Sequence, residues 1–111
     1  MSLKDVLSRL EADHHFTANV SHWKKIPPRD AVFRSLPADL PEQLRGAVTK
    51  RGITQLYSHQ AEAYAAVRRD EHVVIVTPTA SGKTICYNLP VLHDLLEHPE
   101  KRALYLFPTK A

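Results

Sequence analysis

The chain has 111 residues, and with 43% hydrophobic residues, 24% charged residues and a formal net charge of +3 it has the composition of a globular domain with one small core. No apolar run approaches the roughly 18 residues that a membrane-spanning helix needs, and the N-terminus lacks the pattern of a secretory signal, so we expect an intracellular, cytoplasmic protein without a membrane partner. The single cysteine, and histidines without HxxxH or HExxH spacing, argue against a disulfide and against a zinc site.

Residues 2–12 place apolar side chains at helical spacing, with Ser2 as the expected N-cap and Asp5 in the position of a capping box. This pattern predicts a short amphipathic helix. Between residues 13 and 41 the periodicity ends and prolines recur, which predicts an extended arm. Two large aromatic side chains in the arm are expected to anchor it to a core surface, Trp23 and Phe33.

A second helix is predicted over residues 41–51, because apolar side chains recur at helical spacing and Gly52 follows where a C-terminal glycine is expected. A third helix is predicted to begin with Ser58 as its N-cap and to end before the polar residues 68–71.

Two apolar runs predict strands that are buried in a parallel sheet. Residues 72–76 contain a continuous β-branched run, and residues 103–107 form a second run of large apolar side chains. Thr84–Leu96 is the predicted return helix, with Pro90 expected to kink it or to mark a boundary and Cys86 expected to be a small core residue. Strand, helix and strand of these lengths make a right-handed βαβ crossover.

The segment Thr77–Thr84 lies between the first predicted strand and the return helix, which is the position that a phosphate-binding loop requires. In such a loop, backbone N–H groups point at the phosphates and Gly82 lets the backbone approach them closely. Lys83 brings a charge to the β- and γ-phosphates of ATP, and the Thr84 hydroxyl is a ligand for Mg²⁺. The residues expected to bind nucleotide here are Thr79, Ala80, Ser81, Gly82, Lys83 and Thr84. The alternative is a tight turn with a coincidental Gly-Lys-Thr.

The loop departs from the general pattern at Thr77, which stands where its first glycine would be. In this form it resembles the first motif of superfamily 2 helicases of the DEAD/DEAH-box group. Upstream, Leu56–Gln60 is similar to the adenine-binding glutamine motif of that group. The resemblance implies that Gln60 pairs with the adenine edge and that Tyr57 flanks the base. An exposed helix glutamine and a tyrosine packed on the sheet edge are the alternatives.

Residues 103–111 resemble the start of motif Ia in the same group. The resemblance implies that Pro108, Thr109 and Lys110 contact the backbone of bound nucleic acid, and a solvated loop after a strand is the alternative. The residues around the phosphate-binding segment and the Pro-rich lead-in with its tryptophan resemble most the YprA-like branch of DNA helicases. This branch favours DNA as the partner and DNA repair as the process.

Together these features predict an α/β fold, with the start of a RecA-like P-loop NTPase domain and its parallel βαβ core over residues 53–111. A helical and extended arm precedes it over residues 1–52. We expect the N-terminal ATP- and nucleic-acid-binding segment of an ATP-dependent DNA helicase, located at the nucleoid in a bacterium, that couples ATP hydrolysis to strand translocation or unwinding. A free-standing ATP-binding or interaction module without motor activity, and another kind of P-loop NTPase, are the alternatives.

A motor of this class also needs an acidic Walker B pair and a second RecA-like domain. The chain ends within the motif Ia resemblance, and the acids after the loop do not follow a predicted buried strand: Asp94, Glu97 and Glu100. We therefore expect that Lys83 and Thr84 are its catalytic residues, that the remainder of the helicase is required for activity, and that this chain by itself hydrolyses no ATP at a useful rate.

Overall fold

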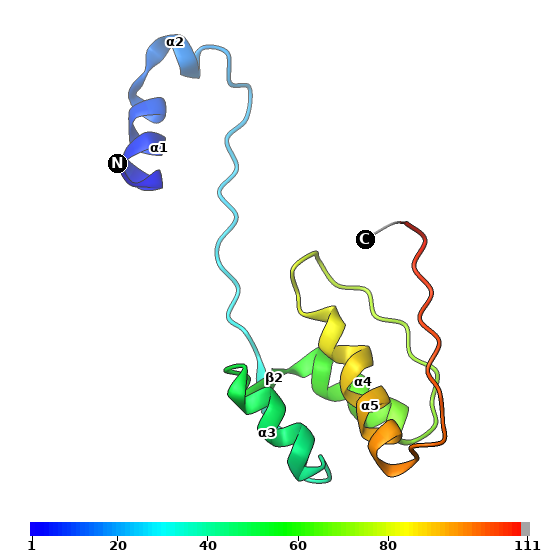
Figure 1. The fold of residues 1–111 in the computed structure, drawn as a ribbon. Helices are drawn as coiled ribbons and strands as arrows, with labels where there is room; N and C mark the ends of the chain where they lie inside the picture. The colour runs from blue at the N-terminus through cyan, green and yellow to red at the C-terminus, as the bar shows by residue number, and fades with distance from the viewer. Residues whose placement is uncertain (110–111) are drawn as a thin grey trace. The chain divides into compact units, whose positions relative to one another are not determined.

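The computed structural model describes residues 1–109. Within these residues the chain forms two compact units, and the division between them falls after Asp30 (Figure 1). The division into residues 1–52 and 53–111 stays a prediction. The helix that we expected over residues 41–51 packs into the core of the second unit.

The N-terminal unit begins with helix α1 (Leu3–Ala12), as predicted. The Asp5 N–H donates to the Ser2 hydroxyl at 3.3 Å, and the Ser2 N–H donates to the Asp5 carboxylate at 2.7 Å. This is the predicted capping box, which satisfies two backbone donors near the start of the helix. The hydrogen bond from the Ser2 backbone also lowers the pKa of the Asp5 carboxyl.

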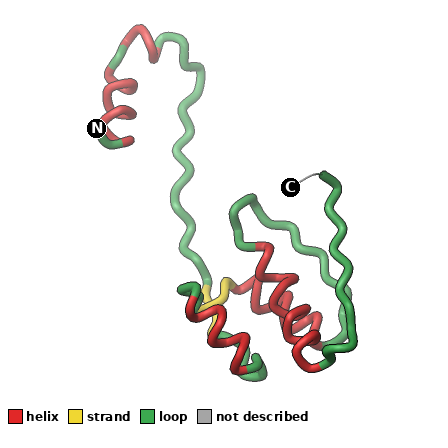
Figure 2. The backbone as a smooth tube through the Cα atoms, viewed as in Figure 1, coloured by secondary structure: helices red, strands yellow, loops and turns green. Residues whose placement is uncertain are grey.

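A single-turn helix that we did not predict, α2 (His14–Thr17), follows in the expected extended arm. The Asp13 carboxylate caps it by accepting hydrogen bonds from the N–H groups of His15 and Phe16. Trp23 packs edge-on against Phe16, with ring centroids 6.2 Å apart, so its anchoring is local to this unit. The arm beyond it is extended as predicted (Figure 2).

The second unit contains an antiparallel pair of short strands and the remaining helices (Figure 1). Strand β1 (Phe33–Ser35) pairs with β2 (Gln55–Tyr57) in a register that places Arg34 opposite Leu56. The helices are α3 (Glu42–Lys50), α4 (Ser58–Arg68) and α5 (Lys83–Glu97). This sheet was not predicted from the sequence, because three-residue strands are too short to show a period.

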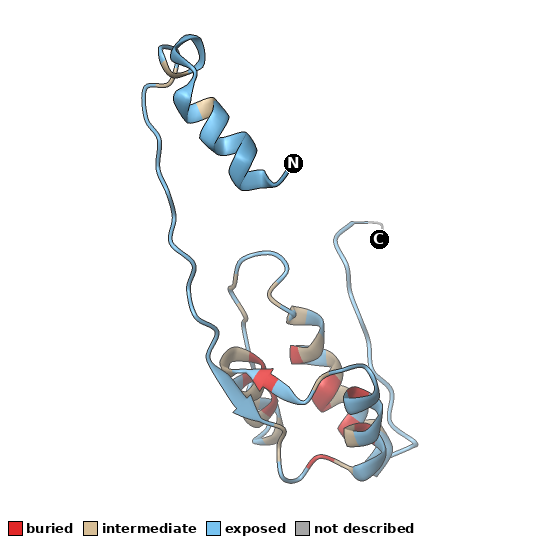
Figure 3. Ribbon diagram, turned by 90° about the vertical axis from the view of Figure 1, so that its left-hand side faces the viewer, coloured by how far each residue is buried: buried red, intermediate tan, exposed pale blue. Residues whose placement is uncertain are grey.

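The core of the second unit lies where β2, α3, α4 and α5 meet (Figure 3). These elements and the loop before α3 contribute its buried side chains: Leu40, Leu44, Val48, Leu56, Tyr64 and Leu89. Leu56 is fully buried. Burial stabilises a large apolar side chain by about 1.5–3 kcal/mol, so this cluster is what holds α4 against α5.

Helix α3 ends at the predicted glycine. Gly52 has a φ of +83°, and its N–H donates to the Thr49 carbonyl at 2.9 Å. The N–H of Ile53 donates to the Val48 carbonyl at 3.0 Å. These two bonds form a Schellman motif, in which a left-handed residue ends the helix and reverses the chain. The reversal leads the chain into β2.

Helix α5 continues through Pro90, where we predicted a kink or a boundary. The proline removes one backbone donor, and burial of the helix in the core offsets this loss. Cys86 is buried as predicted, and burial raises the pKa of its thiol. Among the helices of residues 1–109, none combines the length and the apolar character needed to cross a bilayer.

The buried strands predicted over residues 72–76 and 103–107 are not formed within the described part of the chain. Val74 and Val76 each expose 89% of their surface, and Leu104 exposes 84%. A strand buried in a parallel sheet needs hydrogen-bonded neighbours and a packed layer on both faces, and residues 1–109 do not supply them here. An open groove of about 600 Å³ is lined instead by α4 and by the segment leading to the loop.

A hydrogen-bonded network joins α4 to α5. The Tyr64 hydroxyl lies 2.5 Å from Nδ1 of buried His93 and 3.2 Å from the Asp39 carboxylate. On the other edge of the ring, Nε2 of His93 lies 2.9 Å from the Glu97 carboxylate, which also pairs with Arg68 at 3.2 Å. Burial and, after it, the Asp39 carboxylate raise the pKa of Tyr64 to about 12.

This network predicts a loss of stability at alkaline pH. An unfolded tyrosine ionises near pH 10, so the contribution of Tyr64 is complete below pH 10 and is lost as the pH rises toward 12. Between these pH values, we expect the free energy of unfolding to fall by about 2 kcal/mol more in the unaltered chain than in Tyr64→Phe. Urea unfolding followed by circular dichroism measures this difference, and equal pH slopes for the two chains would contradict it.

Candidate nucleotide-binding site

The predicted phosphate-binding segment is a largely exposed loop that leads directly into α5. Gly82 is the N-cap of the helix, with φ of +74° and ψ of +31°, and Ala80 also has a positive φ of +61°. A left-handed backbone costs a residue with a Cβ about 1–2 kcal/mol, whereas glycine adopts it freely. Contacts outside the loop must therefore hold it in this conformation.

Gln60 provides one of these contacts. It lies in the first turn of α4, and its Nε2 donates to the Gly82 carbonyl at 2.9 Å. Its Oε1 accepts a hydrogen bond from the Tyr57 N–H, also at 2.9 Å. Only 6% of the Gln60 surface is exposed, so the alternative of an exposed helix glutamine is wrong. The helix begins at Ser58 with Tyr57 as its N-cap, one residue earlier than predicted. The contact of Gln60 with adenine stays a prediction.

The same glutamine explains why residue 82 is a glycine. A Cβ at this position would collide with Nε2 of Gln60, in addition to the strain that a side chain would meet at this φ. The left-handed backbone therefore favours the residue without a side chain, and any other residue would also displace the Gln60 side chain from its bond to the loop.

His59 provides a second contact, which the sequence did not predict. Its Nε2 lies 2.8 Å from the Ser81 carbonyl oxygen. The Ser81 hydroxyl in turn lies 2.6 Å from the Thr77 hydroxyl, across the loop. Thr77, which replaces the first glycine of the general motif, thus closes the loop with a side-chain hydrogen bond. In the sequence, this contact is indicated only by the position of His59 directly before Gln60.

An aromatic stack stands beside these contacts. The ring of Tyr57 lies parallel to that of His59, with centroids 5.7 Å apart, and stacks on Phe33 at 5.1 Å. Phe33 is 47% exposed and Tyr57 is 39% exposed, so both rings offer an accessible edge or face. Phe33 was predicted only as an anchor for the arm. Its place beside Tyr57 results from the pairing of β1 with β2, which no sequence pattern indicates.

Lys83 and Thr84 occupy the first turn of α5. The ammonium of Lys83 donates to the Pro78 carbonyl at 3.1 Å, which places its charge over the loop. Thr79 and Thr84 are exposed. The positive end of the α5 dipole lies at this turn and favours an anion, although the roles of these residues in binding stay predictions.

The residues predicted to bind nucleic acid lie apart from the loop in sequence. Pro108 and Thr109 form an exposed bend after the extended residues 103–107. That segment lies along α5, where the Tyr105 hydroxyl donates to the side-chain oxygen of Asn88 at 3.0 Å. Lys110 lies outside the described residues, and the contact with nucleic acid stays a prediction.

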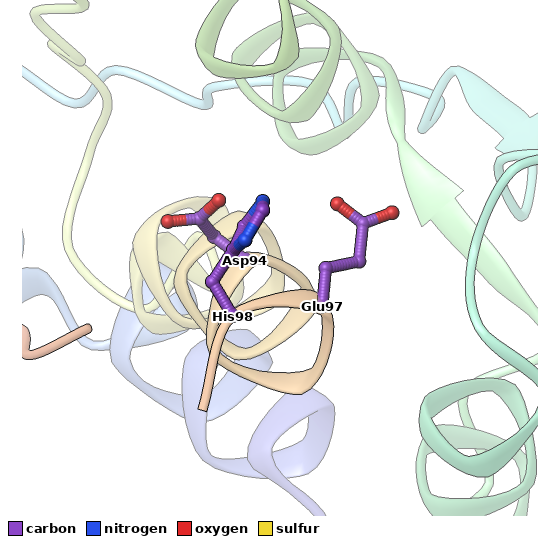
Figure 4. A group of neighbouring side chains, drawn as sticks. All are labelled: Asp94, Glu97 and His98. Carbon is purple, nitrogen blue, oxygen red and sulfur yellow. The ribbon is translucent and has the colours of Figure 1, made fainter. Parts of the chain in front are cut away.

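The acidic side chains at the far end of α5 form ion pairs and hydrogen bonds with other residues of the chain. Ligand atoms of Asp94, Glu97 and His98 lie within 4.8 Å of one another (Figure 4). Lys101 lies 3.0 Å from Asp94, and its hydrogen bond lowers the pKa of that carboxyl. The hydrogen bond from His93, and then that from Arg68, do the same for Glu97. These partners already neutralise the cluster, which lies at the opposite end of the helix from the loop.

Comparison with known proteins places the loop in a family. The family model described as DEAD/DEAH box helicase matches residues 57–111. Over 97% of its length the chain is 49% identical to the uncharacterized ATP-dependent helicase YprA of Bacillus subtilis, and over 99% it is 33% identical to the ATP-dependent helicase HRQ1 of Saccharomyces cerevisiae. A crystal structure of the DUF1998 helicase MrfA bound to DNA and AMPPNP matches 98% of the chain with a TM-score of 0.89 at 47% identity.

The chain is short beside these proteins. It spans 14% of the length of YprA, 10% of HRQ1 and 15% of the MrfA chain. The resemblance to the DEAD/DEAH-box group is thus confirmed over residues 57–111, and that to YprA over nearly the whole chain. Most of each relative lies outside the comparison.

The contact between Gln60 and the loop predicts a large effect of Gly82→Ala. The added Cβ meets Gln60 and a strained φ, so we expect the free energy of unfolding to fall by about 2–3 kcal/mol, from strain together with one lost hydrogen bond. Gly46→Ala is the matched control, because its Cβ would meet open space within α3 and should stabilise the helix by about 0.5–1 kcal/mol. Urea unfolding of both variants gives the comparison, and equal effects would contradict the close contact.

Proposed function

Because this chain belongs to the DEAD/DEAH box helicase family, we propose that its loop and the first turn of α4 form the ATP-binding half-site of an ATP-dependent DNA helicase. The observation that carries the proposal is the pair of bonds from α4 to the loop, which join residues 22 positions apart at one site. In a protein of the length of the relatives, ATP hydrolysis at this site drives translocation along DNA or its unwinding.

The phosphate groups of ATP bind at the loop and the start of α5. The backbone N–H groups of residues 79–84 surround the phosphates, and the ammonium of Lys83 exchanges the Pro78 carbonyl for a phosphate oxygen. The exposed hydroxyl of Thr84 is the chain's ligand for Mg²⁺, an ion that prefers oxygen donors and neutralises phosphate charge. Lys83 and Thr84 are the catalytic residues that this chain contributes.

The adenine binds at Gln60. A carboxamide has two N–H donors and an oxygen with two lone pairs, and the bonds to Gly82 and Tyr57 use one of each. The remaining donor and lone pair match N7 and the N6 amino group of adenine, whereas guanine offers two acceptors at the same edge. The accessible rings of Tyr57 and Phe33 flank the base and supply apolar contact.

The DNA binds at Pro108, Thr109 and Lys110. The structure of MrfA that resembles this chain was determined with DNA bound, which supports a nucleic-acid contact in the same family. The exposure of the first two residues, after an extended segment that runs along α5, is compatible with a contact to phosphates. We propose that the protein acts on DNA in the cytoplasm.

The two exposed apolar segments take part in a parallel sheet in a protein of the relatives' length. Residues 72–76 and 103–107 are extended, have the side chains of buried strands and are connected through α5. Further strands pair with them and complete the βαβ core of a RecA-like domain. This sheet then carries the loop between a strand and a helix, as phosphate-binding loops require.

Equilibrium binding of a fluorescent ATP analogue with Mg²⁺ tests the half-site. We expect the chain to bind the analogue, and Lys83→Ala to weaken its affinity by about 10- to 100-fold through loss of a charge-assisted bond. We also expect ATP to compete far better than GTP, because Gln60 selects adenine. Lys101→Ala is the matched control, since this lysine pairs with Asp94 at the other end of α5.

Two outcomes would count against the half-site. Affinity that is equal in the chain and in Lys83→Ala would exclude the loop as the phosphate site. Equal competition by GTP and ATP would exclude Gln60 as the group that selects the base.

A further inference from the structure

Two consecutive residues of α4 bind two consecutive carbonyls of the loop. The Ser81 carbonyl lies 2.8 Å from Nε2 of His59, and the Gly82 carbonyl accepts from Gln60 at 2.9 Å. The glutamine belongs to the motif that suggested the adenine site. The histidine makes a similar contact with the neighbouring carbonyl. The phosphate-binding motif and adenine recognition do not explain this contact.

The direction of a carbonyl fixes the direction of the next N–H. In a trans peptide the C=O of one residue and the N–H of the following residue point in opposite directions, and the chain has no cis peptide among its described residues. The bond to the Ser81 carbonyl therefore turns the Gly82 N–H away from α4. By the same argument, Gln60 turns away the N–H of Lys83.

The peptide between Ser81 and Gly82 is the one in the loop that most needs such a restraint. Rotation of a peptide plane changes φ of the residue that follows it, and glycine is stable on both sides of φ = 0. Gly82 is thus required for the close approach of Gln60, yet it also leaves the peptide before it free to rotate. A hydrogen bond to the Ser81 carbonyl removes this freedom.

The surroundings of His59 hold its ring in place as a hydrogen-bond donor through Nε2. A carbonyl oxygen is only an acceptor, so Nε2 must carry a proton. Both the neutral Nε2–H tautomer and the imidazolium meet this condition, whereas the neutral Nδ1–H tautomer does not. The side chain is half-buried, and its ring lies within 8° of parallel to the Tyr57 ring, which limits its rotation.

We propose that His59 is a positioning residue of the nucleotide site, which holds the Ser81 carbonyl through Nε2–H and thereby aims the Gly82 amide at the phosphate groups. This proposal rests on the proposed function of the loop as the phosphate site. His59 touches no nucleotide atom itself, and its contribution is to the phosphate groups and not to the base.

The first test compares two substitutions at position 59. His59→Gln keeps an N–H donor at nearly the distance of Nε2, whereas His59→Ala removes it. We expect His59→Ala to weaken binding of both the ATP analogue and inorganic tripolyphosphate by about five- to tenfold, and His59→Gln to stay within about twofold of the unaltered chain. His98→Ala and His98→Gln are matched controls, because this exposed histidine follows the far end of α5.

The second test needs no ligand. Long-range proton–nitrogen spectra of the chain should show a proton on Nε2 of His59, and the Gly82 amide resonance should move in His59→Ala and return in His59→Gln. A purely structural role, such as stacking on Tyr57, would not restore the resonance in the glutamine variant.

The outcomes separate the two proposals. Equal affinities of His59→Ala and His59→Gln, or an Nδ1–H tautomer, would overturn the role of His59 while leaving the effect of Lys83→Ala intact. If the chain binds neither ATP nor tripolyphosphate, the proposed function fails, and the spectra still decide whether His59 orients the Gly82 peptide.

Discussion

The hydrogen bonds from the first turn of α4 to the carbonyls of the loop are the constraint on which the rest of the site depends. They form only because α4 and α5 are packed together, with Tyr64 and Leu89 in one buried cluster. That packing supplies a fixed frame. The side-chain bonds fix a loop in which Ala80 has a strained left-handed backbone and Gly82 is otherwise free to rotate.

The burial of Gln60 connects folding with binding. Its amide group is held between the backbone of residue 57 and that of residue 82, so the atoms that we propose to contact the base are positioned before any ligand arrives. Preorganisation of this kind lowers the entropic cost of ordering the side chain when a ligand binds. A substitution at position 60 would therefore disturb the shape of the loop and, on the function that we propose, the choice of base together with it.

How much the sequence predicted depends on the range of the interactions involved. The capping box of α1 and the Schellman motif of α3 were predicted because both are local and use residue types that suit them. The pairing of β1 with β2, and with it the place of Phe33, was not, because it joins distant segments. The apolar runs at residues 72–76 and 103–107 indicate a preference for a sheet, but a strand also requires partners, which no run of residues specifies by itself. Within the site, the motif predicted the loop, and only the fold could place His59 beside it.

The distribution of the core residues has a consequence for the order in which the chain folds. All members of the core cluster except Leu89 come from residues 40–64, and contacts of short sequence separation form quickly. Residues 40–64 therefore leave the ribosome before residues 72–76 do. The side chains of residues 72–76 and 103–107 remain largely exposed beside this core, so their unpaired edges stay open to aggregation until further strands pair with them.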